Sequence, residues 1–456
     1  MIKVMKFGGS SVADADAMRR VSGHVVRALA NGDRIVVVVS ALAQVTNQLT
    51  TLSWYSREQG KVNDELLLIV KQRHQLLAQQ LIGKSLSAKN TLERVQLWLE
   101  QLFGNLKGEL NALTEVDHNL DIISEERFSA RMAQVLAYGE LASSTLLHVF
   151  LLLSGVDNLW MDARSLIVTN DHWLQAVPDF DLIKNRVRDQ LKGQLEHYTL
   201  VVVPGFMGGT VSGQTTLLGR EGSDYSAAIL AEALEADELQ IWSDVDGVMG
   251  IDPRYDVAAT VLSQLSYSQA GELATWGGKV LYPSTVEPVK RAGIPIGIFN
   301  SLIDGPVVAG TCISNQDNEQ FWAVGGLLQP LVIRWQGSED FQQFLAQLSA
   351  YNLELRGVFP LSGEFLIIAQ DHHKPGGYQS NYRRLVTAYP AVEFSMDWDL
   401  VAVMGGSLNL AEQDLVDIAG AWLLPASDLA YSRVALVPRG HLEQILVDLY
   451  NRHNNG

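Results

Sequence analysis

Apolar, β-branched runs alternate with helical patterns through the first 300 residues of this 456-residue chain. The runs lie at residues 35–40, 200–206, 239–245 and 294–300, and each is bounded by Gly, Asp or Pro. Helical patterns such as "ADAMRRVSGHVVRALANG" and "SDYSAAILAEALEAD" lie between them. A run that is apolar throughout fits a strand buried on both faces, and a helix between such strands is the usual parallel crossover. The pattern therefore predicts an α/β domain with a mostly parallel central sheet.

A long helical segment at residues 56–153 interrupts this alternation. Its first part is polar and rich in Lys and Gln, and its last part, "EERFSARMAQVLAYGELASSTLLHVFLLL", is strongly apolar. The segment predicts a helical subdomain that leads back into the sheet. Because Ser143, Ser144 and His148 break its most apolar stretch, we expect no membrane span.

The composition excludes several classes of protein. The net charge is -17, and a chain this acidic is a poor partner for nucleic-acid backbones or anionic membranes. Apolar residues make up 47% of the chain, enough for a sizeable core. The single cysteine, Cys312, excludes an internal disulfide and a cysteine metal cluster, and it fits the reducing cytoplasm.

From about residue 320 the pattern becomes a tandem repeat. "PLVIRW", "SEDFQQFLAQLSAYN", "LELRGVF", "EFLIIAQ" and "YQSNYRRLVTAY" read as strand, helix, strand, strand and helix, and a similar series starts about 69 residues later at "LVAVMG". In that second series, "LAEQDLVDIAGAWLL" and "HLEQILVDLYNRH" read as helices. We expect two small α+β units at about residues 320–390 and 391–456. Effector binding and a purely structural duplication both stay open.

The motif "KFGGSS", at residues 6–11, stands directly after an apolar N-terminal run. Glycines at a strand-to-helix turn let backbone N–H groups approach an anion, and a helix N-terminus adds a favourable dipole. Lys6 adds a point charge suited to phosphate. The motif matches neither GxxxxGK[ST] nor GxGxxG. These residues alone leave a phosphate site and an ordinary tight turn open.

Later motifs also carry groups suited to anionic ligands. In "LLGREGSDYSAA", Ser223 and Asp224 fit a helix N-cap, and Arg220 beside that helix start fits a carboxylate pocket. The aspartates of "WSDVDGVMGIDPR" fit turn formation, or contact with a ribose or a metal. In "TWGGKVLYP", Lys279 follows a second glycine pair.

Glu140 lies within an apolar helical pattern, "AYGELASS". A carboxylate on such a face costs free energy unless it is paired. A nearby arginine such as Arg131 and a substrate ammonium are the two kinds of partner that the residues leave open.

Together and in this order, the motifs resemble the aspartate kinase family of the amino acid kinase superfamily. "KFGGSSV", "GREGSDYSA", "WSDVDGV…DPR" and "GGKVLYP" match that family's signatures, and the tandem repeat stands in the place of its ACT domains. The resemblance is closest to the kinase half of bifunctional aspartokinase/homoserine dehydrogenase II proteins. It implies a three-layer amino acid kinase fold at residues 1–305 and tandem ACT-like domains at residues 306–456.

The resemblance implies transfer of the ATP γ-phosphoryl group to the side-chain carboxylate of L-aspartate, with Mg²⁺ bridging the phosphates. This is the first step of lysine, threonine and methionine biosynthesis. Lys6 and Asp224 match the family's catalytic residues. The substrate contacts that the match implies are Ser40, Thr46, Glu140, Phe206, Arg220 and Ser223. The nucleotide contacts that it implies are Lys6, Gly8, Gly9, Ser10, Ser243, Asp244, Met249, Arg254 and Lys279.

Some positions depart from the family pattern. Met249 replaces a usual tyrosine, and Gly278 and Tyr282 replace a usual alanine and histidine. The family's glycine-rich effector loop is not recognisable in "YNLELRGVFPLSGEF" or in "LLPASDLAYSRV", so we expect no inhibition by lysine or threonine.

The resemblance also implies a cytoplasmic homodimer, or dimer of dimers, joined through the C-terminal domains. It leaves open a fused homoserine dehydrogenase domain in the natural polypeptide. No GxGxxG follows the repeat, so we expect no dehydrogenase activity in this chain. Two alternatives stay open, a catalytically silent regulatory homologue and a superfamily kinase that acts on another carboxylate.

Overall fold

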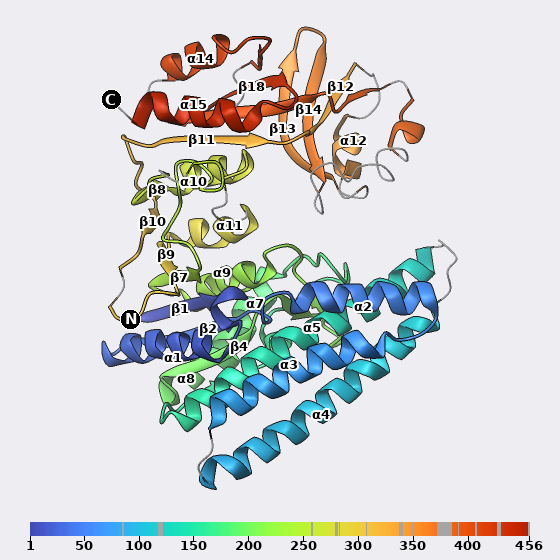
Figure 1. The fold of residues 1–456 in the computed structure, drawn as a ribbon, viewed down its shortest axis with the longest axis vertical. Helices are drawn as coiled ribbons and strands as arrows, with labels where there is room; N and C mark the ends of the chain where they lie inside the picture. Colours follow the sequence, from blue (N-terminus) through green and yellow to red (C-terminus); the bar gives the residue numbers. More distant parts are fainter. Residues whose placement is uncertain are drawn as a thin grey trace. The chain divides into compact units, whose positions relative to one another are not determined.

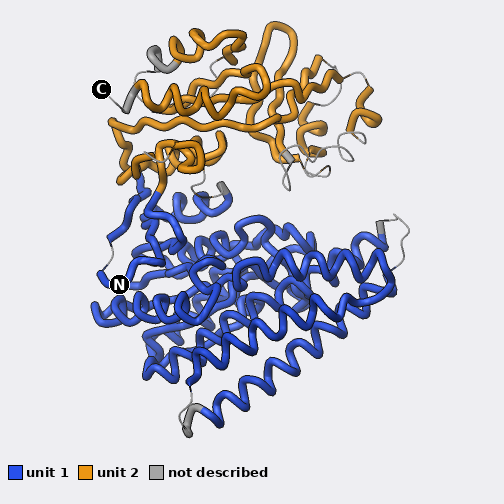
Figure 2. Tube along the Cα trace, viewed as in Figure 1, with its two compact units in different colours: residues 1–247, 284–315 blue, residues 248–283, 316–456 orange. Residues whose placement is uncertain are grey.

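The computed structural model describes residues 1–83, 86–116, 122–256, 259–278, 281, 283–306, 308–336, 341–348, 351, 353–371, 385–390, 392–405, 408–425 and 430–454. The chain divides into two compact units (Figure 2). Unit 1 consists of Met1–Gly247 and Ser284–Asn315, and unit 2 of Val248–Pro283 and Gln316–Gly456. The division differs from the expected boundary near residue 305, because residues 248–283 group with the C-terminal part of the chain.

A mostly parallel sheet forms the centre of unit 1 (Figure 1). The order of its strands within unit 1 is β3-β4-β2-β1-β7-β9-β10. The bounds are β1 Ile2–Phe7, β2 Arg34–Val39, β3 Leu159–Trp160, β4 Leu200–Pro204, β7 Glu238–Ser243, β9 Ile296–Asn300 and β10 Thr311–Ser314. Only β10 runs antiparallel to its neighbour among these described strands. The four apolar runs therefore form β2, β4, β7 and β9, and the predicted fold class is confirmed.

The central strands are apolar because they are covered on both faces. Ile35 to Val39 are fully buried, although successive side chains of a strand point to opposite faces. Helices α1, α5 and α9 pack against this sheet. The helices of unit 1 are α1 Ala15–Ala30, α2 Val45–Gln59, α3 Asp64–Ile82, α4 Leu86–Thr114, α5 Ile122–Leu153, α6 Ala163–Leu166, α7 Phe180–Arg186, α8 Gln194–His197, α9 Gly222–Leu234 and α11 Pro283–Ala292. Shorter elements are the turn η1 Ser10–Val12, the π-helix η2 Val187–Lys192 and the strands β5 Met207–Gly209 and β6 Thr215–Leu217.

Helices α2 to α5 form the subdomain expected from the long helical segment, and they contact one another (Figure 1). Within α5, residues Ile123–Leu153 are long and apolar enough to cross a membrane, which differs from the expectation drawn from the breaks at Ser143, Ser144 and His148. In this structure 67% of the most apolar window is buried inside the protein, and a core helix of a soluble protein meets the same criterion.

Two antiparallel sheets lie among the described residues of unit 2, in the orders β11-β16-β18-β17 and β13-β14-β12-β15. Their bounds are β11 Trp322–Leu327, β12 Leu331–Trp335, β13 Leu353–Leu361, β14 Glu364–Asp371, β15 Glu393–Ser395, β16 Trp398–Gly405, β17 Trp422–Leu423 and β18 Ser432–Pro438. The remaining elements are β8 Gln264–Ser266, α10 Tyr267–Thr275, α12 Phe341–Leu348, α14 Leu408–Val416 and α15 Leu442–Asn454.

These sheets interleave the two copies of the repeat. Strand β11 of the first copy pairs with β16 of the second, and β15, beyond the expected boundary at 390, pairs with β12 of the first. The helix expected at residues 410–424 ends at Val416, and Trp422–Leu423 instead pairs with β18 after the left-handed Gly420. Most of the helix expected at residues 378–389 lies outside the described residues.

Candidate active site

The carboxyl ends of parallel strands in unit 1 lie in one row along one edge of the sheet. Phe7 pairs with Val39 and with Trp242, and the next pairs along this row are Val39 with Pro204 and Trp242 with Phe299. Gly8, Ser40 and Gly205 follow β1, β2 and β4, and Ser243 and Asn300 are the last residues of β7 and β9. Strand β1 lies between β2 and β7, where the strand order changes direction. Ligands of open parallel sheets bind at such an edge and such a point.

The turn after β1 is built by close backbone approaches. The N–H of Gly8 donates to the carbonyl of Trp242 at 3.2 Å, and the N–H of Ser11 donates to the carbonyl of Gly8 at 3.0 Å. A Cβ atom on Gly9 would lie 3.0 Å from the carbonyl oxygen of Ala41. Glycine is therefore needed at position 9 for this turn to pack against Ala41.

Lys6 and Asp224 form a buried ion pair at this edge. The Nζ atom of Lys6 lies 2.5 Å from Oδ1 of Asp224, and the two residues are only 7% and 6% exposed. Asp224 stands in the first turn of α9, where the helix dipole favours a negative charge. The structure thus brings together the two residues that the sequence assigned to catalysis, although they lie 218 positions apart in the chain.

Glu221 joins this pair, and the sequence analysis did not assign it. Its backbone is left-handed, with φ 51° and ψ 27°, and its carboxyl group is hydrogen-bonded to that of Asp224. The residue as a whole is exposed, but protein atoms crowd its carboxyl group. This crowding, together with the negative charge of Asp224, raises the pKa of Glu221. No sequence signal reveals such a residue, because glycine or asparagine is usual in this conformation.

Glu140 on α5 is deeply buried at 3% exposure. Its carboxyl group accepts from the backbone N–H of Ala41, but Oε2 has no hydrogen-bond partner within the described part of the chain. Burial raises the pKa of Glu140 to about 8. Arg131 pairs instead with Glu109 at 2.7 Å, so it is not the partner of Glu140. Arg131 is therefore excluded as the partner of Glu140, and a ligand cation, the other partner that the sequence left open, stays a prediction.

The other residues expected at the substrate belong to the same strand ends and helix starts. Phe206 follows β4 in a left-handed conformation, and a Cβ atom on Gly222 would lie 2.6 Å from its ring. A Cβ atom on Gly205 would lie 2.8 Å from Cβ of Ser223, which shows that β4 ends tightly against the start of α9.

Three further expected residues lie around this edge. Ser40 donates its N–H to the carbonyl of Phe7 at 3.2 Å, and its own carbonyl accepts from Oγ of Ser143 on α5 at 2.6 Å. Thr46 stands in the first turn of α2. Arg220 is exposed and lies close enough to Glu221 for its charge to oppose the rise in that carboxyl's pKa.

The residues expected at the nucleotide are divided between the two units. In unit 1, the carbonyl of Ser243 accepts from the N–H and Oγ of Ser301 at 2.7 and 2.8 Å, and Asp244 is exposed. In unit 2, Asp252 holds the guanidinium of Arg254, with Nη2 at 2.5 Å from Oδ2. Met249 forms an isolated bridge with Val261. Lys279 and Tyr282 lie outside the described residues.

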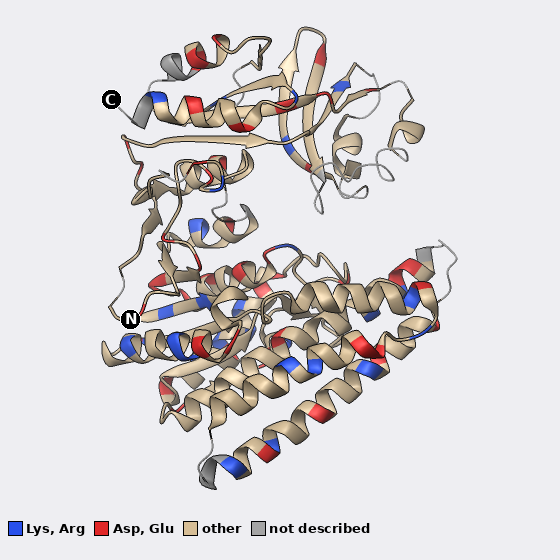
Figure 3. Ribbon diagram, in the orientation of Figure 1, with Lys and Arg blue, Asp and Glu red and all other residues tan. Residues whose placement is uncertain are grey.

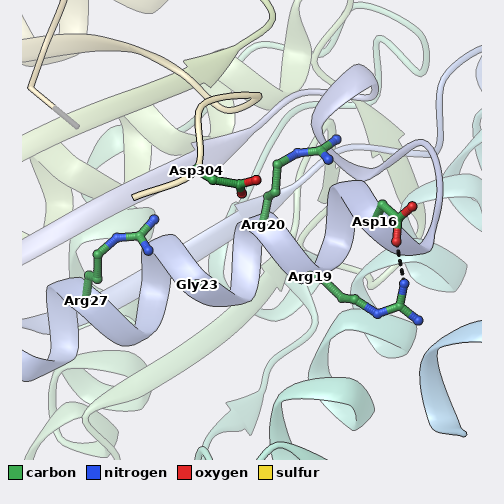
Figure 4. A pocket seen from close by; sticks show the side chains of 6 residues that line it. All are labelled: Asp16, Arg19, Arg20, Gly23, Arg27 and Asp304. Atoms are coloured by element: carbon green, nitrogen blue, oxygen red, sulfur yellow. Dashed lines mark hydrogen bonds and ion pairs between the residues drawn. The ribbon is translucent and has the colours of Figure 1, made fainter. Parts of the chain in front are cut away.

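A surface depression of about 330 Å³ lies beside α1. It is lined by Asp16, Arg19, Arg20, Gly23, Arg27 and Asp304 (Figure 4). Basic positions follow one another along α1 in Figure 3, and the two aspartates that line the depression, Asp16 and Asp304, offset their charge. None of the residues expected at the substrate or nucleotide lines this depression.

Residues 1–300 match the profile of the "Amino acid kinase family". The chain belongs to the amino acid kinase family. The match covers the whole parallel sheet apart from β10, and it includes both Lys6 and Asp224.

Relatives of this amino acid kinase include lysine-sensitive aspartokinase 3 of Escherichia coli (strain K12), 35% identical over 316 residues, which are 69% of this chain and 64% of that protein. A bifunctional aspartokinase/homoserine dehydrogenase of Daucus carota is 32% identical over 70% of this chain and 33% of that protein. The aligned region thus spans less than two thirds of either relative. Among solved structures, E. coli aspartokinase III in complex with aspartate and ADP superposes with a TM-score of 0.79, at 26% identity, over 99% of this chain and 100% of that one. Because that superposition extends through the two C-terminal sheets, those sheets are consistent with ACT-like domains.

Proposed function

We propose that this amino acid kinase transfers the γ-phosphoryl group of ATP to the side-chain carboxylate of L-aspartate, giving 4-phospho-L-aspartate. The observation that carries the proposal is the buried Glu140 carboxyl group, whose Oε2 lacks a partner in the described residues. Its hydrogen bond to Ala41 places it beside the Gly9 turn, on the edge that also carries the Lys6–Asp224 pair. A carboxyl group in that position fits the ammonium of an amino acid substrate.

The relatives support this substrate. The structural neighbour from E. coli is described as an aspartokinase in complex with aspartate and ADP. The two curated relatives are likewise named as aspartokinases. The proposed reaction is the first step of lysine, threonine and methionine biosynthesis.

The chemistry requires no general base, because the side-chain carboxylate of aspartate is already ionised at neutral pH. One carboxylate oxygen forms a bond to the γ-phosphorus as the bond from that phosphorus to the ADP oxygen breaks. Lys6 would neutralise charge on the transferring phosphoryl oxygens, and Asp224 would hold the ammonium of Lys6 in place. Gly8, Gly9 and Ser10 would line the same turn.

The substrate groups have separate partners in this proposal. Glu140 would pair with the ammonium of aspartate and Arg220 with its α-carboxylate, since arginine binds carboxylates with two parallel hydrogen bonds. The pocket walls would come from Ser40, Thr46, Phe206 and Ser223. The nucleotide contacts would come from Ser243, Asp244, Met249, Arg254 and Lys279.

Mg²⁺ would neutralise the phosphates of ATP. The described residues contain no group of three or more His, Cys, Asp or Glu that could hold a metal. The proposal needs no such group, because Mg²⁺ in kinases is commonly held mostly by phosphate oxygens and water. Lys6 and the turn at Gly8 would then hold the phosphates that hold the ion.

We further propose that a second copy of this chain pairs with the C-terminal sheets, whose outer strands β11, β17, β13 and β15 end each sheet within the described residues. Analytical ultracentrifugation would test the expected dimer or dimer of dimers, and a monomer at micromolar concentration would contradict it. The cytoplasmic location stays a prediction from the single Cys312, and a fused homoserine dehydrogenase domain in the natural polypeptide stays open.

The test of the kinase is acyl phosphate formation from ATP and L-aspartate, trapped with hydroxylamine. Hydroxamate that depends on both substrates is the expected result. Hydroxamate with L-glutamate but not with L-aspartate would indicate a kinase for another carboxylate. If the folded protein formed none with any carboxylate, the silent homologue would replace this proposal.

A further inference from the structure

Met249 and Arg254 belong to a segment that folds back on itself in unit 2. One arm is residues 248–256 and the other is residues 259–262. The N–H of Gly250 donates to the carbonyl of Thr260 at 3.1 Å, and the N–H of Leu262 donates to the carbonyl of Val248 at 2.8 Å. We call these two arms the nucleotide-side hairpin, since the proposed function assigns Met249 and Arg254 to the nucleotide.

The hydroxyl group of Tyr450 holds one arm of this hairpin. It accepts from the backbone N–H of Thr260 at 2.9 Å and shares a second hydrogen bond with Oγ1 of Thr260 at 2.8 Å. Tyr450 lies on α15, 190 positions further along the chain, and it is only 1% exposed. A phenol buried to this degree needs partners for its hydroxyl group, and the described contacts of that hydroxyl group are with Thr260.

The other arm is held by the same C-terminal elements. The carbonyl of Gly250 accepts from the N–H of Val324 on β11 at 2.8 Å. A Cβ atom on Gly250 would lie 3.0 Å from the ring of Tyr450 and 3.1 Å from the carbonyl oxygen of Trp322. Ile251 is buried in one core cluster with Tyr450, and α15 lies along β11 in Figure 1.

A chain of contacts connects Tyr450 to Arg254. The arm runs from Gly250 through Ile251 to Asp252, whose carboxylate accepts from both the backbone N–H and the guanidinium Nε of Arg254 at 3.0 Å. Arg254 is therefore oriented by its own arm, and that arm is packed against the ring of Tyr450 and tied through Thr260 to its hydroxyl group. Losing the contact between the Tyr450 hydroxyl group and Thr260 would make the arm that carries Arg254 more mobile, while every contact of Arg254 itself is kept.

We propose that Tyr450 is a positioning residue for nucleotide binding, because it fixes the hairpin that carries Met249 and Arg254 to the C-terminal helix. The proposal rests on the proposed function, since it assumes that the hairpin contacts the nucleotide. It assigns the C-terminal elements β11 and α15 a part in binding one substrate, beyond any part in dimerisation.

The test compares Tyr450→Phe, which removes only the hydroxyl group, with the control Tyr431→Phe in the full chain. Tyr431 donates its hydroxyl hydrogen to Asp317 at 2.8 Å in the same unit, and it makes no contact with the hairpin among the described hydrogen bonds. Kinetic constants for both substrates and ADP binding by calorimetry are measured for each variant and for the unaltered chain.

Tyr450→Phe should raise KM for ATP and Kd for ADP by ~5-fold, the usual effect of losing one or two hydrogen bonds that water partly replaces. KM for L-aspartate should stay unchanged, and Tyr431→Phe should change neither constant. A purely structural role would lower thermal stability and leave the two KM values in their original ratio. An unchanged KM for ATP in Tyr450→Phe, or an equal rise in both variants, would overturn the positioning role.

Hydrogen exchange separates this proposal from the proposed function. Amides of the hairpin, among them those of Gly250 and Thr260, should exchange faster in Tyr450→Phe than in Tyr431→Phe without any nucleotide present. If they do while the unaltered chain binds no ADP, the hairpin is held as described but the nucleotide assignment is wrong. Unchanged exchange would show that the hydroxyl group does not hold the hairpin.

Discussion

Oδ1 of Asp224 lies 2.5 Å from Nζ of Lys6, at the point where β1 ends against the first turn of α9. Both side chains are almost fully buried, so each charge compensates the other where water is excluded. An incoming phosphoryl group would become the second anion beside Lys6. Asp224 therefore keeps the ammonium group of Lys6 at the sheet edge and balances its charge when no substrate is bound.

Lys6→Ala should abolish turnover while the protein stays folded. Removing one group that stabilises charge in a transition state commonly lowers kcat by about 10²–10³-fold, and Lys6 is the buried cation that the proposed function assigns to the phosphoryl group. The measurement is hydroxamate formation, with circular dichroism to establish the fold.

The matched control is Lys3→Ala. Lys3 lies on the same strand and pairs with Asp33 at 2.9 Å and with Glu238 at 3.4 Å, away from the carboxyl edge. It should keep kcat within about twofold. Near-normal turnover in folded Lys6→Ala would show that Lys6 has no part in the chemistry.

Glu140 should make the unliganded protein less stable as the pH rises. Its pKa is raised from 4.5 to about 8 in the folded state, so between these values the native state holds a proton that the unfolded chain has released. Stability from this group is thus fully present below pH 4.5 and is lost as the pH rises through 8. The loss is on the order of a few kcal/mol.

Urea unfolding at pH 5 and pH 8 measures this effect. Between pH 5 and pH 8, the free energy of unfolding should fall more in the unaltered chain than in Glu140→Gln. Saturating L-aspartate should make the fall in the unaltered chain smaller, because the ammonium of L-aspartate would pair with the ionised carboxylate. Glu140→Gln should also raise KM for L-aspartate by about 10–100-fold. Parallel pH dependence in the two proteins would show that Glu140 ionises normally.

Glu221→Gly should raise the free energy of unfolding and also lower KM for ATP. A left-handed conformation costs a residue with a Cβ atom about 1–2 kcal/mol, of which glycine's greater freedom in the unfolded chain cancels part, so we expect a gain of about 0.5–1 kcal/mol. Glu221→Gln keeps the strained backbone but removes the second carboxylate beside Asp224. It should lower KM for ATP about two- to fivefold.

Glu235 provides the control for both changes, because it is the left-handed residue at the other end of α9, with φ 54°. Glu235→Gly should give a similar gain in stability and Glu235→Gln no change in KM. Equal KM values for Glu221→Gln and the unaltered chain would mean that the Glu221 carboxyl group does not influence the bound phosphates.

Lysine, threonine and methionine should each leave the hydroxamate rate within error of the control. The family's effector loop is not recognisable in "YNLELRGVFPLSGEF" or in "LLPASDLAYSRV". Rates are compared at subsaturating L-aspartate, where a competitive effect is largest. Inhibition by any of the three would show that the C-terminal sheets bind an effector through residues that the family pattern does not reveal.

The sequence predicted local features that depend on neighbouring residues. The runs of β2, β4, β7 and β9 are strands because consecutive β-branched side chains suit a sheet covered on both faces. Lys6 and Asp224 could each be identified from their neighbours alone, since Lys6 lies in the motif "KFGGSS" at a strand end and Asp224 in "GREGSDYSA" at a helix start.

Features that depend on distant residues were not predictable in the same way. The pairing of β11 with β16 crosses the boundary of the repeat, because hydrogen bonds between strand edges depend on which edges meet and not on chain order. Glu221 was missed because its backbone conformation is left-handed, and only the contact with Asp224 makes that conformation relevant to the site.

The sequence by itself determined the alternation of strands and helices, the glycines of the turn after β1 and the charges available for an anionic substrate. Only the tertiary structure decided which charges meet. It paired Lys6 with Asp224, gave Arg131 to Glu109 and left Oε2 of Glu140 without a partner in the described residues. The physical reason is that a charge's partner and its pKa depend on burial and on distances of a few ångströms, which arise only when separate segments pack together.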